Sequence, residues 1–188
     1  WTTDAKGKPM RIYLAGPAVF LPNAAEVGRK LKSMCAAHGM EGVFPLDGDG
    51  GLKPVRNPDD IAQNIYRTNI SLIQSCQAVV ADMTPFRGPS MDPGTAFEMG
   101  YAAALGKPVI GFTLEEGDYL DRVLTYYRGN LSVSGNQWFD PDGLEVENFG
   151  LPDNLMMCGS CSVITQGIDQ ALIAARSILR RPLETELA

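Results

Sequence analysis

The chain has 188 residues with 45% hydrophobic and 20% charged side chains, which suits one globular domain with a full core and is short for two. Its formal net charge of -6 argues against a surface for nucleic acid or anionic membranes, because no basic patch is available to neutralise phosphates. No apolar run approaches the roughly 20 residues of a membrane span, so we expect a cytoplasmic protein that binds neither partner.

Short strand-like and helix-like runs alternate through the first half of the chain. Residues 1–10 lack the apolar stretch of a secretory signal and are predicted to be a flexible leader. Gly16-Pro17 and His38-Gly39 are stop signals that end the first strand and the first helix. The predicted elements are a strand at 11–15, a helix at 24–37, a strand at 42–45, a polar loop at 46–58, and a helix from Asp59 or Asp60 to about Ser75.

The alternation continues in the second half and is interrupted once. Residues 78–81 form a near-continuous apolar run, typical of a strand covered on both faces. Residues 117–152 are poorly periodic, and we predict a helix at 119–128 and a long excursion with turns at 129–150. The other predicted elements are a helix from about Thr95 to Leu105, a strand at 109–112, a short helix at 152–157, a strand at 162–164 and a helix at 167–179.

This order of elements predicts an α/β fold, a doubly wound parallel sheet of five strands with helices on both faces. It forms a single domain at 11–180, followed by a frayed tail at 181–188. In such a sheet the ligand crevice lies beyond the carboxyl ends of the strands. The loops after Tyr13, Phe44 and Asp82 should therefore meet at one crevice.

Two of the four cysteines, Cys158 and Cys161, have the C-x-x-C spacing of a redox pair or of half a zinc site. The sequence holds no second such pair and only one histidine, His38, so a tetrahedral metal site would be short of ligands. We predict that the pair forms a turn between two segments, and we expect neither a metal nor a cofactor.

The candidate chemistry lies between Asp82 and Gly100. A G-x-G-x-x-G motif, a Walker lysine and a G-x-S-x-G elbow are all missing from the sequence, which leaves Asp92 and Glu98 as candidates. Pro93 separates them, so Asp92 lies on the loop and Glu98 in the first turns of a helix, whose N-terminus favours the Glu98 anion. Two carboxylates about 5 Å apart are the arrangement of retaining glycosyl transfer, in which one attacks the anomeric carbon and the other handles the leaving-group proton.

The local pattern supports a second interpretation. Thr95-Ala96-Phe97-Glu98 matches a capping box, in which Glu98 bonds the Thr95 amide. Asp92 followed by Pro93 likewise matches an N-cap with proline at the first helical position. A glutamate that caps its helix cannot face the crevice as a free nucleophile, so the pattern leaves both interpretations open.

Four ordered blocks carry a resemblance to a known family: residues 12–20 (IYLAGPAVF), Ala81-Asp82 with residues 85–88 (PFRG), residues 92–104 (DPGTAFEMGYAAA) and residues 149–156 (FGLPDNLM). Together they resemble the nucleoside 2-deoxyribosyltransferase family, its trypanosomatid-like, purine-preferring members more than the short lactobacillal ones. The resemblance spans residue 11 to about residue 179. It implies a flavodoxin-like fold and the transfer of 2-deoxyribose, with retention, between nucleobases that are preferably purines.

The resemblance also implies roles for individual residues. Glu98 matches the nucleophile that forms a covalent deoxyribosyl-enzyme intermediate, Asp92 the carboxyl that protonates the departing base, and Tyr13 the tyrosine that orients the nucleophile. Asn154 and Met156 match residues that reach a neighbouring subunit's site. The expected partners are therefore deoxynucleosides, free nucleobases and further copies of the chain in a homo-oligomer with shared sites.

Five further residues are candidates for substrate contacts. Gly16 matches the backbone close to the ligand, and Gly94 belongs to the block that holds both carboxylates. Asn69 stands where many members carry an aspartate; its amide can bind by hydrogen bonds, without proton transfer, or it is a solvated polar residue. Asp47 and Arg87 lie on the loops after the second and third strands, with an Asx-turn and a plain loop cation as their alternatives.

Two other functions stay open. A deoxynucleoside 5'-monophosphate N-glycosidase would use the same glutamate and deliver the sugar to water, but it needs groups that bind a 5'-phosphate where this chain has the neutral Asn154. A non-catalytic nucleotide-binding domain on the same fold would have Glu98 capping its helix and facing away from the crevice.

Overall fold

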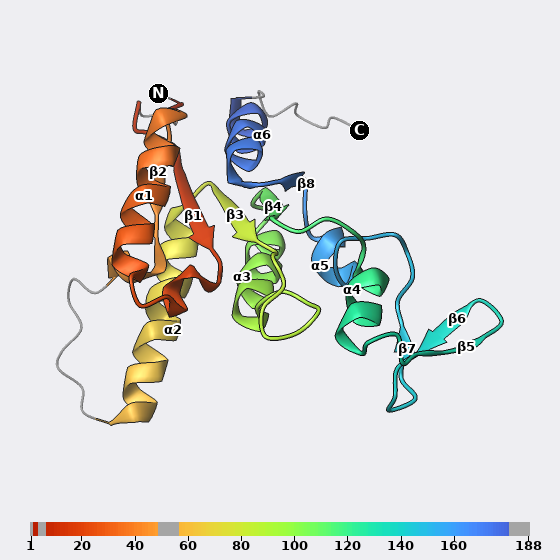
Figure 1. Ribbon diagram of the computed structural model, residues 1–188. Coiled ribbons are helices and arrows are strands. Elements are labelled where there is room, and N and C mark those ends of the chain that lie inside the picture. Colours follow the sequence, from red (N-terminus) through yellow and green to blue (C-terminus); the bar gives the residue numbers. More distant parts are fainter. Residues whose placement is uncertain (1, 4–6, 49–56, 181–188) are drawn as a thin grey trace.

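The computed structural model describes residues 2–3, 7–48 and 57–180 of the chain. Five parallel strands form the central sheet in the order β2-β1-β3-β4-β8 (Figure 1). The predicted doubly wound α/β architecture is confirmed. The strands are β1 (Arg11–Ala15), β2 (Glu41–Val43), β3 (Ala78–Asp82), β4 (Val109–Thr113) and β8 (Val163–Gln166).

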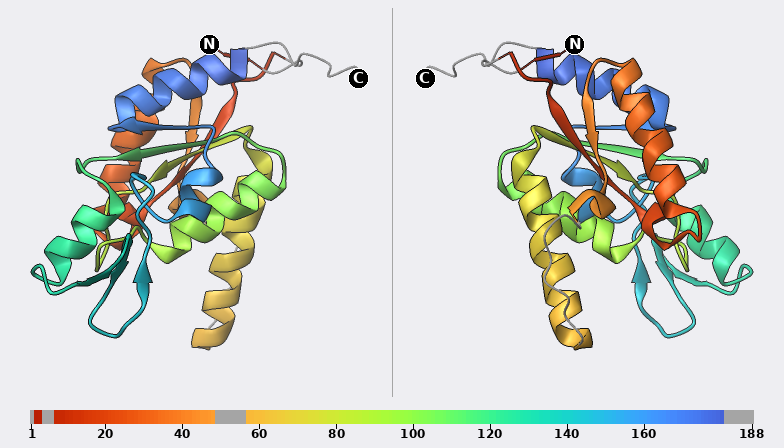
Figure 2. Two further views of the ribbon diagram at one scale, coloured as in Figure 1. Left: turned by 90° about the vertical axis from the view of Figure 1, so that its right-hand side faces the viewer. Right: turned by 90° about the vertical axis from the view of Figure 1, so that its left-hand side faces the viewer.

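Helices cover both faces of this sheet, α1 and α6 on one side and α2, α3 and α5 on the other (Figure 2). In the described part of the chain, none of them is both long and apolar enough to cross a membrane. The helices are α1 (Ala24–Ala37), α2 (Pro58–Ser75), α3 (Pro93–Ala104), α4 (Tyr119–Tyr126), α5 (Leu155–Gly159) and α6 (Ile168–Arg180), with 3-10 turns η1 (Pro17–Phe20) and η2 (Pro45–Gly48).

Strand β1 divides its side chains between two cores, because successive residues of a strand point to opposite faces. Ile12 and Leu14 pack in the core beneath α1 and α6. Tyr13 and Ala15 pack in the core beneath α2 and α3. The Tyr13 ring is fully buried, and its hydroxyl lies on the side of the sheet that carries α3.

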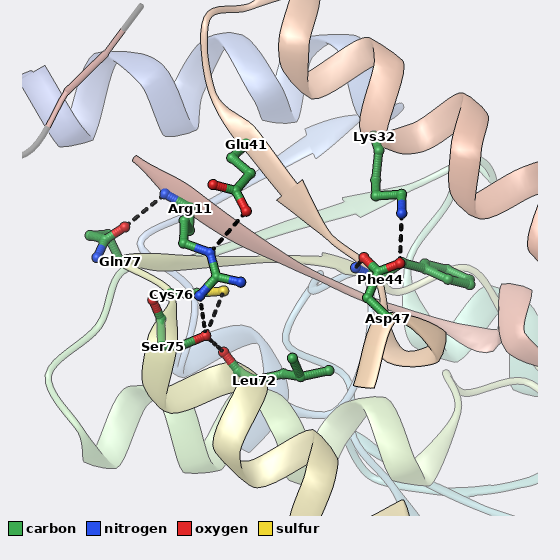
Figure 3. A network of polar contacts seen from close by, with 9 residues as sticks. All are labelled: Arg11, Lys32, Glu41, Phe44, Asp47, Leu72, Ser75, Cys76 and Gln77. Carbon is green, nitrogen blue, oxygen red and sulfur yellow. Dashed lines mark hydrogen bonds and ion pairs between the residues drawn. The ribbon is translucent and has the colours of Figure 1, made fainter. Parts of the chain in front are cut away.

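A network at the start of β1 ties that strand to its neighbours (Figure 3). The Arg11 guanidinium donates to Glu41 Oε1 of β2 at 3.1 Å and to Ser75 Oγ of α2 at 2.6 Å, while the Arg11 amide donates to Gln77 Oε1 at 2.7 Å. These contacts hold β1 at the end of the sheet opposite its carboxyl ends.

Several predicted boundaries shift by a few residues. The strand predicted at 42–45 is observed as β2 at Glu41–Val43, and Pro45 already belongs to η2. The short helix predicted at 152–157 is observed as α5 at Leu155–Gly159. Helix α2 begins at Pro58, before the predicted Asp59 or Asp60, because the Asn57 side chain caps it by accepting from the Asp59 amide. Most of the predicted loop at 46–58, and the tail at 181–188, fall outside the described residues.

The predicted excursion at 129–150 contains a small antiparallel sheet, β5 (Ser132–Ser134), β6 (Gln137–Phe139) and β7 (Glu145–Val146) (Figure 1). Val146 and Trp138 pack against Leu120 and Val123 of α4, which gives this sheet a small core of its own. Strands of two or three residues are too short for their alternation to be recognised in the sequence.

Thr2 and Thr3 differ from the flexible leader expected at 1–10. The Thr2 amide donates to Gly39 O at 2.7 Å, the Met10 amide donates to Thr2 O at 2.7 Å, and Thr3 forms a bridge with Pro9. Residues 1 and 4–6 of the predicted leader lie outside the described part.

Two helical glycines provide a test of the packing. A Cβ at Gly28 of α1 would lie 2.6 Å from Phe44 Cδ1, whereas a Cβ at Gly100 of α3 would meet nothing within 4 Å. Gly28→Ala should lower the free energy of unfolding by about 1–3 kcal/mol through overpacking, and Gly100→Ala should raise it by roughly 0.5–1 kcal/mol through helix propensity. Urea denaturation of both variants checks this; shifts of the same sign would contradict the packing of α1 on Phe44.

Candidate active site

The Glu98 carboxylate lies where three elements meet. It projects from the second turn of α3, and its Oε1 accepts a hydrogen bond of 2.6 Å from the Tyr13 hydroxyl of β1. Asn69 of α2 donates to the same oxygen over 3.4 Å. The Glu98 side chain therefore faces the carboxyl end of the sheet, and the predicted association of Glu98 with Tyr13 is present.

Asp92, and not Glu98, caps α3. Its Oδ2 accepts hydrogen bonds of 2.8 Å from both the amide and the hydroxyl of Thr95. The N-cap interpretation of Asp92 is thus confirmed, and the capping-box interpretation of Glu98 is wrong. Because Asp92 already satisfies the Thr95 amide, Glu98 is left to face the crevice.

Both carboxylates line one pocket of about 450 Å³. Its polar groups gather around Glu98, and the remaining wall is apolar, as in typical small-molecule sites. Five of the predicted site residues line this pocket: Gly16, Asn69, Asp92, Gly94 and Glu98. The other lining residues are Val19, Phe20, Pro45, Leu46, Ile65, Thr68 and Thr95.

Burial dominates the electrostatics of Glu98. It raises the pKa of the Glu98 carboxyl to about 7, the Asp92 carboxylate adds to the rise, and the hydrogen bonds from Tyr13 and Asn69 oppose it. Burial beside Glu98 also raises the pKa of the Tyr13 hydroxyl, so Tyr13 stays a donor. The expectation that the helix N-terminus favours the Glu98 anion is therefore outweighed by desolvation.

Two predicted glycines lie where a side chain would disturb the site. A Cβ at Gly16 would lie 2.9 Å from Asp82 Cβ, which would push apart the loops after β1 and β3. A Cβ at Gly94 would lie 3.1 Å from Asp92 Oδ2. Both residues line the pocket, and because they have no side chain their backbone forms its surface directly.

Asp47 is not among the residues that line this pocket. Its Oδ1 accepts from Lys32 Nζ of α1 at 2.6 Å, and its Oδ2 accepts from the Phe44 amide at 2.8 Å (Figure 3). The carboxylate is thus engaged by an amide three residues before it and by an ion pair. The Asx-turn alternative, which needs an amide that follows Asp47, stays a prediction.

Arg87 lies beside a different pocket. Its guanidinium carbon lies 5.3 Å from the Phe20 ring centroid and 4.5 Å from that of Phe86, and these two rings stack on each other. All three side chains border an apolar pocket of about 530 Å³, which also reaches Val27 and Leu31 of α1. Phe20 and Gly16 border both pockets, whereas Arg87 does not line the one that holds Glu98.

Asn154 and Met156 lie at the start of α5 and do not line the Glu98 pocket of their own chain. The Asn154 side chain caps α5 by accepting from the Met156 amide at 3.0 Å, and its amide group donates to Glu147. Met156 is 73% exposed. Their predicted role in a neighbouring subunit's site stays a prediction.

The cysteine pair forms a turn, as predicted. The Cys161 amide donates to Cys158 O at 3.1 Å, directly after α5. Burial raises the pKa of the Cys161 thiol to about 11 and also raises that of Cys158, so neither is a reactive thiolate at neutral pH. Within the described ranges, no group of three His, Cys, Asp or Glu side chains is placed to hold a metal ion.

The sequence interpretation missed several pocket residues. Ile65 lies three positions before Thr68 and four before Asn69, so helical spacing places Ile65 beside both of them on α2. Val19 and Phe20 follow the predicted Gly16 directly. Val19, Phe20 and Ile65 belong to the apolar wall beside the carboxylates, and Thr68 adds a hydroxyl.

Comparison with known proteins agrees with this geometry. The sequence model of the family described as nucleoside 2-deoxyribosyltransferase matches residues 12–156. An uncharacterized protein of Schizosaccharomyces pombe is 37% identical over 159 residues, which cover 79% of this chain and 75% of that protein.

Two solved structures are similar as well. A 2-desoxiribosyltransferase from Leishmania mexicana shares 34% sequence identity at a TM-score of 0.68, over 90% of this chain and 98% of that one. A conserved protein from Enterococcus faecalis V583 shares the fold at 17% identity and a TM-score of 0.56, over 90% and 98% of the two chains.

The raised pKa of Glu98 predicts a pH-dependent stability difference. A carboxyl whose pKa is raised by folding contributes stability below its unfolded pKa and loses that stability as the pH rises through about 7. Glu98→Gln, which carries no charge, should therefore be more stable than the parent at pH 8, by about 2–3 kcal/mol, with little difference at pH 4.

Denaturant titrations at both pH values measure this difference. Glu116→Gln, on an exposed loop, is the control for loss of a surface carboxylate. An equal stability of parent and Glu98→Gln at pH 8 would show that Glu98 ionises without cost and that its pKa is not raised.

Proposed function

Because this chain belongs to the nucleoside 2-deoxyribosyltransferase family, we propose that it transfers 2-deoxyribose between nucleobases through a covalent intermediate on Glu98. One observation carries this proposal. Glu98 is held through Oε1 by Tyr13 and Asn69, in the same pocket as a second carboxylate, Asp92. Among the described residues, its Oε2 accepts no side-chain hydrogen bond and is available as a nucleophile.

The proposed reaction has two displacements at C1' of the sugar. Glu98 Oε2 attacks C1', the bond from C1' to the base nitrogen breaks with its electron pair on the base, and Asp92 supplies a proton to that base. An incoming base then attacks C1' from the opposite side, its N–H proton returns to Asp92, and Glu98 is released. Two inversions give net retention, and both protons and electrons balance without a cofactor.

The pocket favours nucleosides over nucleotides. Its described lining carries two carboxylates and no Lys, Arg or His side chain, whereas a 5'-phosphate is bound by cations. This supports transfer over the alternative of a 5'-monophosphate N-glycosidase. The non-catalytic alternative required Glu98 to cap its helix, and that contact is made by Asp92 instead.

The shape of the pocket supports a preference for purines. Phe20, Leu46 and Ile65 form an apolar wall beside the carboxylates, in a space of about 450 Å³. A flat bicyclic base buries more of this wall than a single ring does, and burial of apolar area contributes about 25 cal/mol per Å². Our proposal also includes a homo-oligomer in which Asn154 and Met156 enter a neighbour's site, and a cytoplasmic location.

A single assay separates the candidate activities. The protein is incubated with deoxyinosine, with and without free adenine, and the products are followed by chromatography. Deoxyadenosine formed only with adenine indicates transfer, release of hypoxanthine without adenine indicates hydrolysis, and no reaction over a panel of deoxynucleosides indicates a binding domain. Glu98→Ala should abolish transfer, by a factor of at least about 1,000, while the fold is retained; an active Glu98→Ala variant would remove Glu98 as the nucleophile.

The hydrogen bond from Tyr13 predicts a shift in the pH profile. Glu98 must be ionised to attack, so kcat/KM should fall about tenfold per pH unit below about 7. Tyr13→Phe removes a donor that lowers the pKa of Glu98. The pH below which kcat/KM falls should therefore rise by about one pH unit.

Profiles between pH 5 and 9 measure this shift. Tyr101→Phe is the matched control, because the Tyr101 hydroxyl of α3 accepts from Gln74 and does not line the pocket. An unchanged limb in Tyr13→Phe, or an equal shift in Tyr101→Phe, would contradict control of Glu98 by Tyr13.

A further inference from the structure

Asp153 is a buried carboxylate outside the pocket that is aimed at the loop before Asp92. It lies just before α5 and is 1% exposed. Its Oδ1 accepts from Ser90 Oγ at 2.6 Å and its Oδ2 from the Met91 amide at 2.9 Å. A carboxylate this deeply buried needs such donors, so its contacts with the loop are strong ones.

Arg122 of α4 binds the same loop at Pro89, one residue before Ser90. Its Nε donates to Pro89 O at 3.1 Å, and the residue is 9% exposed. Its Nη1 and Nη2 are buried without a hydrogen-bond partner in the described part of the chain. Arg122 and Asp153 thus contact adjacent residues of one loop, Arg122 at Pro89 and Asp153 at Ser90 and Met91.

Three consecutive residues before Asp92 are therefore held by charged side chains from the second half of the chain. On its other side, Asp92 is held by its own cap on Thr95 through Oδ2. Asp92 Oδ1 accepts none of the hydrogen bonds found among the described residues, and Asp92 borders the pocket. The direction of Asp92 thus depends on both attachments.

We propose that Asp153 is a positioning residue, which fixes the backbone of residues 90–91 so that Asp92 is held where it delivers a proton to the departing base. This inference rests on the proposed transferase function. Asp153 does not touch the pocket that holds Glu98, so it acts through Asp92 and not on the substrate.

The experiment compares two deoxyribosyl donors. With deoxyinosine, the electron pair of the breaking C1'–N9 bond is taken up by a base that needs a proton. With 7-methyl-2'-deoxyguanosine, the cationic base leaves as a neutral molecule, and the electron pair cancels its charge without any proton. A misplaced Asp92 therefore slows the first displacement with deoxyinosine and not with the methylated donor. The second displacement uses Asp92 with either donor, so the comparison follows base release in single turnovers, with enzyme in excess and no acceptor base.

Asp153→Asn keeps the shape of the side chain but replaces one acceptor oxygen by an amino group. Because the Met91 and Asn154 amides donate to different oxygens of Asp153, one of them then faces an amino group, and the attachment of the loop is weakened. In these single turnovers, the rate of base release should fall about 10- to 100-fold for deoxyinosine and less than about threefold for the methylated donor. In the Asp92→Asn background, Asp153→Asn should cause no further loss, because the two residues act as one unit.

Asp140→Asn is the matched control, since Asp140 also accepts backbone N–H groups, from Asp142 and Leu144, but lies in the β6–β7 turn. Ser90→Ala removes one bond to Asp153 and keeps the buried charge. Its loss of rate should depend on the donor in the same way and be smaller. If Asp153→Asn does not fold, Ser90→Ala tests the positioning role in its place.

Equal losses with both donors, or an additive loss in the double variant, would overturn the positioning role and leave Asp153 as a fold-stabilising residue. If the unmodified protein transfers deoxyribose from neither donor, the proposed function fails, and the positioning role fails with it.

Discussion

The hydrogen bond between the Tyr13 hydroxyl and Glu98 Oε1 is the contact on which the site depends. It joins the central sheet to α3, so the packing of that helix decides where the carboxylate lies. The Tyr13 ring is held in the core by strand alternation, which leaves its hydroxyl almost no freedom. Burial disfavours the ionised form of Glu98, and the donors Tyr13 of β1 and Asn69 of α2 partly offset this cost.

The two carboxylates have different positions relative to α3: Asp92 caps the helix, and Glu98 faces the pocket. Asp92 satisfies the free Thr95 amide in the first turn of α3, so Glu98 does not make the capping contact that its position also permits. Burial of Glu98 beside Asp92 is unfavourable and raises its pKa to about 7. The surrounding core tolerates this cost, as is common where a site holds charge against desolvation.

The segment between β4 and β8 contributes to the site without entering its pocket. Arg122 and Asp153 reach across to the loop that precedes Asp92, while the small antiparallel sheet packs behind α4. The acid loop is thus supported by residues that follow it by 33 and by 62 positions. A poorly periodic stretch and the residue directly after it thus contact the loop that leads to Asp92.

The sequence by itself determined the α/β class, the order of its main elements and the crevice at the carboxyl ends, because apolar periodicity and stop signals are local properties. Its local pattern paired Asp92 with Glu98 but left capping as an alternative, and it joined Tyr13 and Asn69 to them only through the resemblance of four blocks to a family. The tertiary structure decided which carboxylate caps α3, that Asp47 turns to Lys32 and that Arg87 stacks on Phe20 and Phe86. Those outcomes depend on donors and rings supplied from distant parts of the chain, and on desolvation, neither of which a local pattern records.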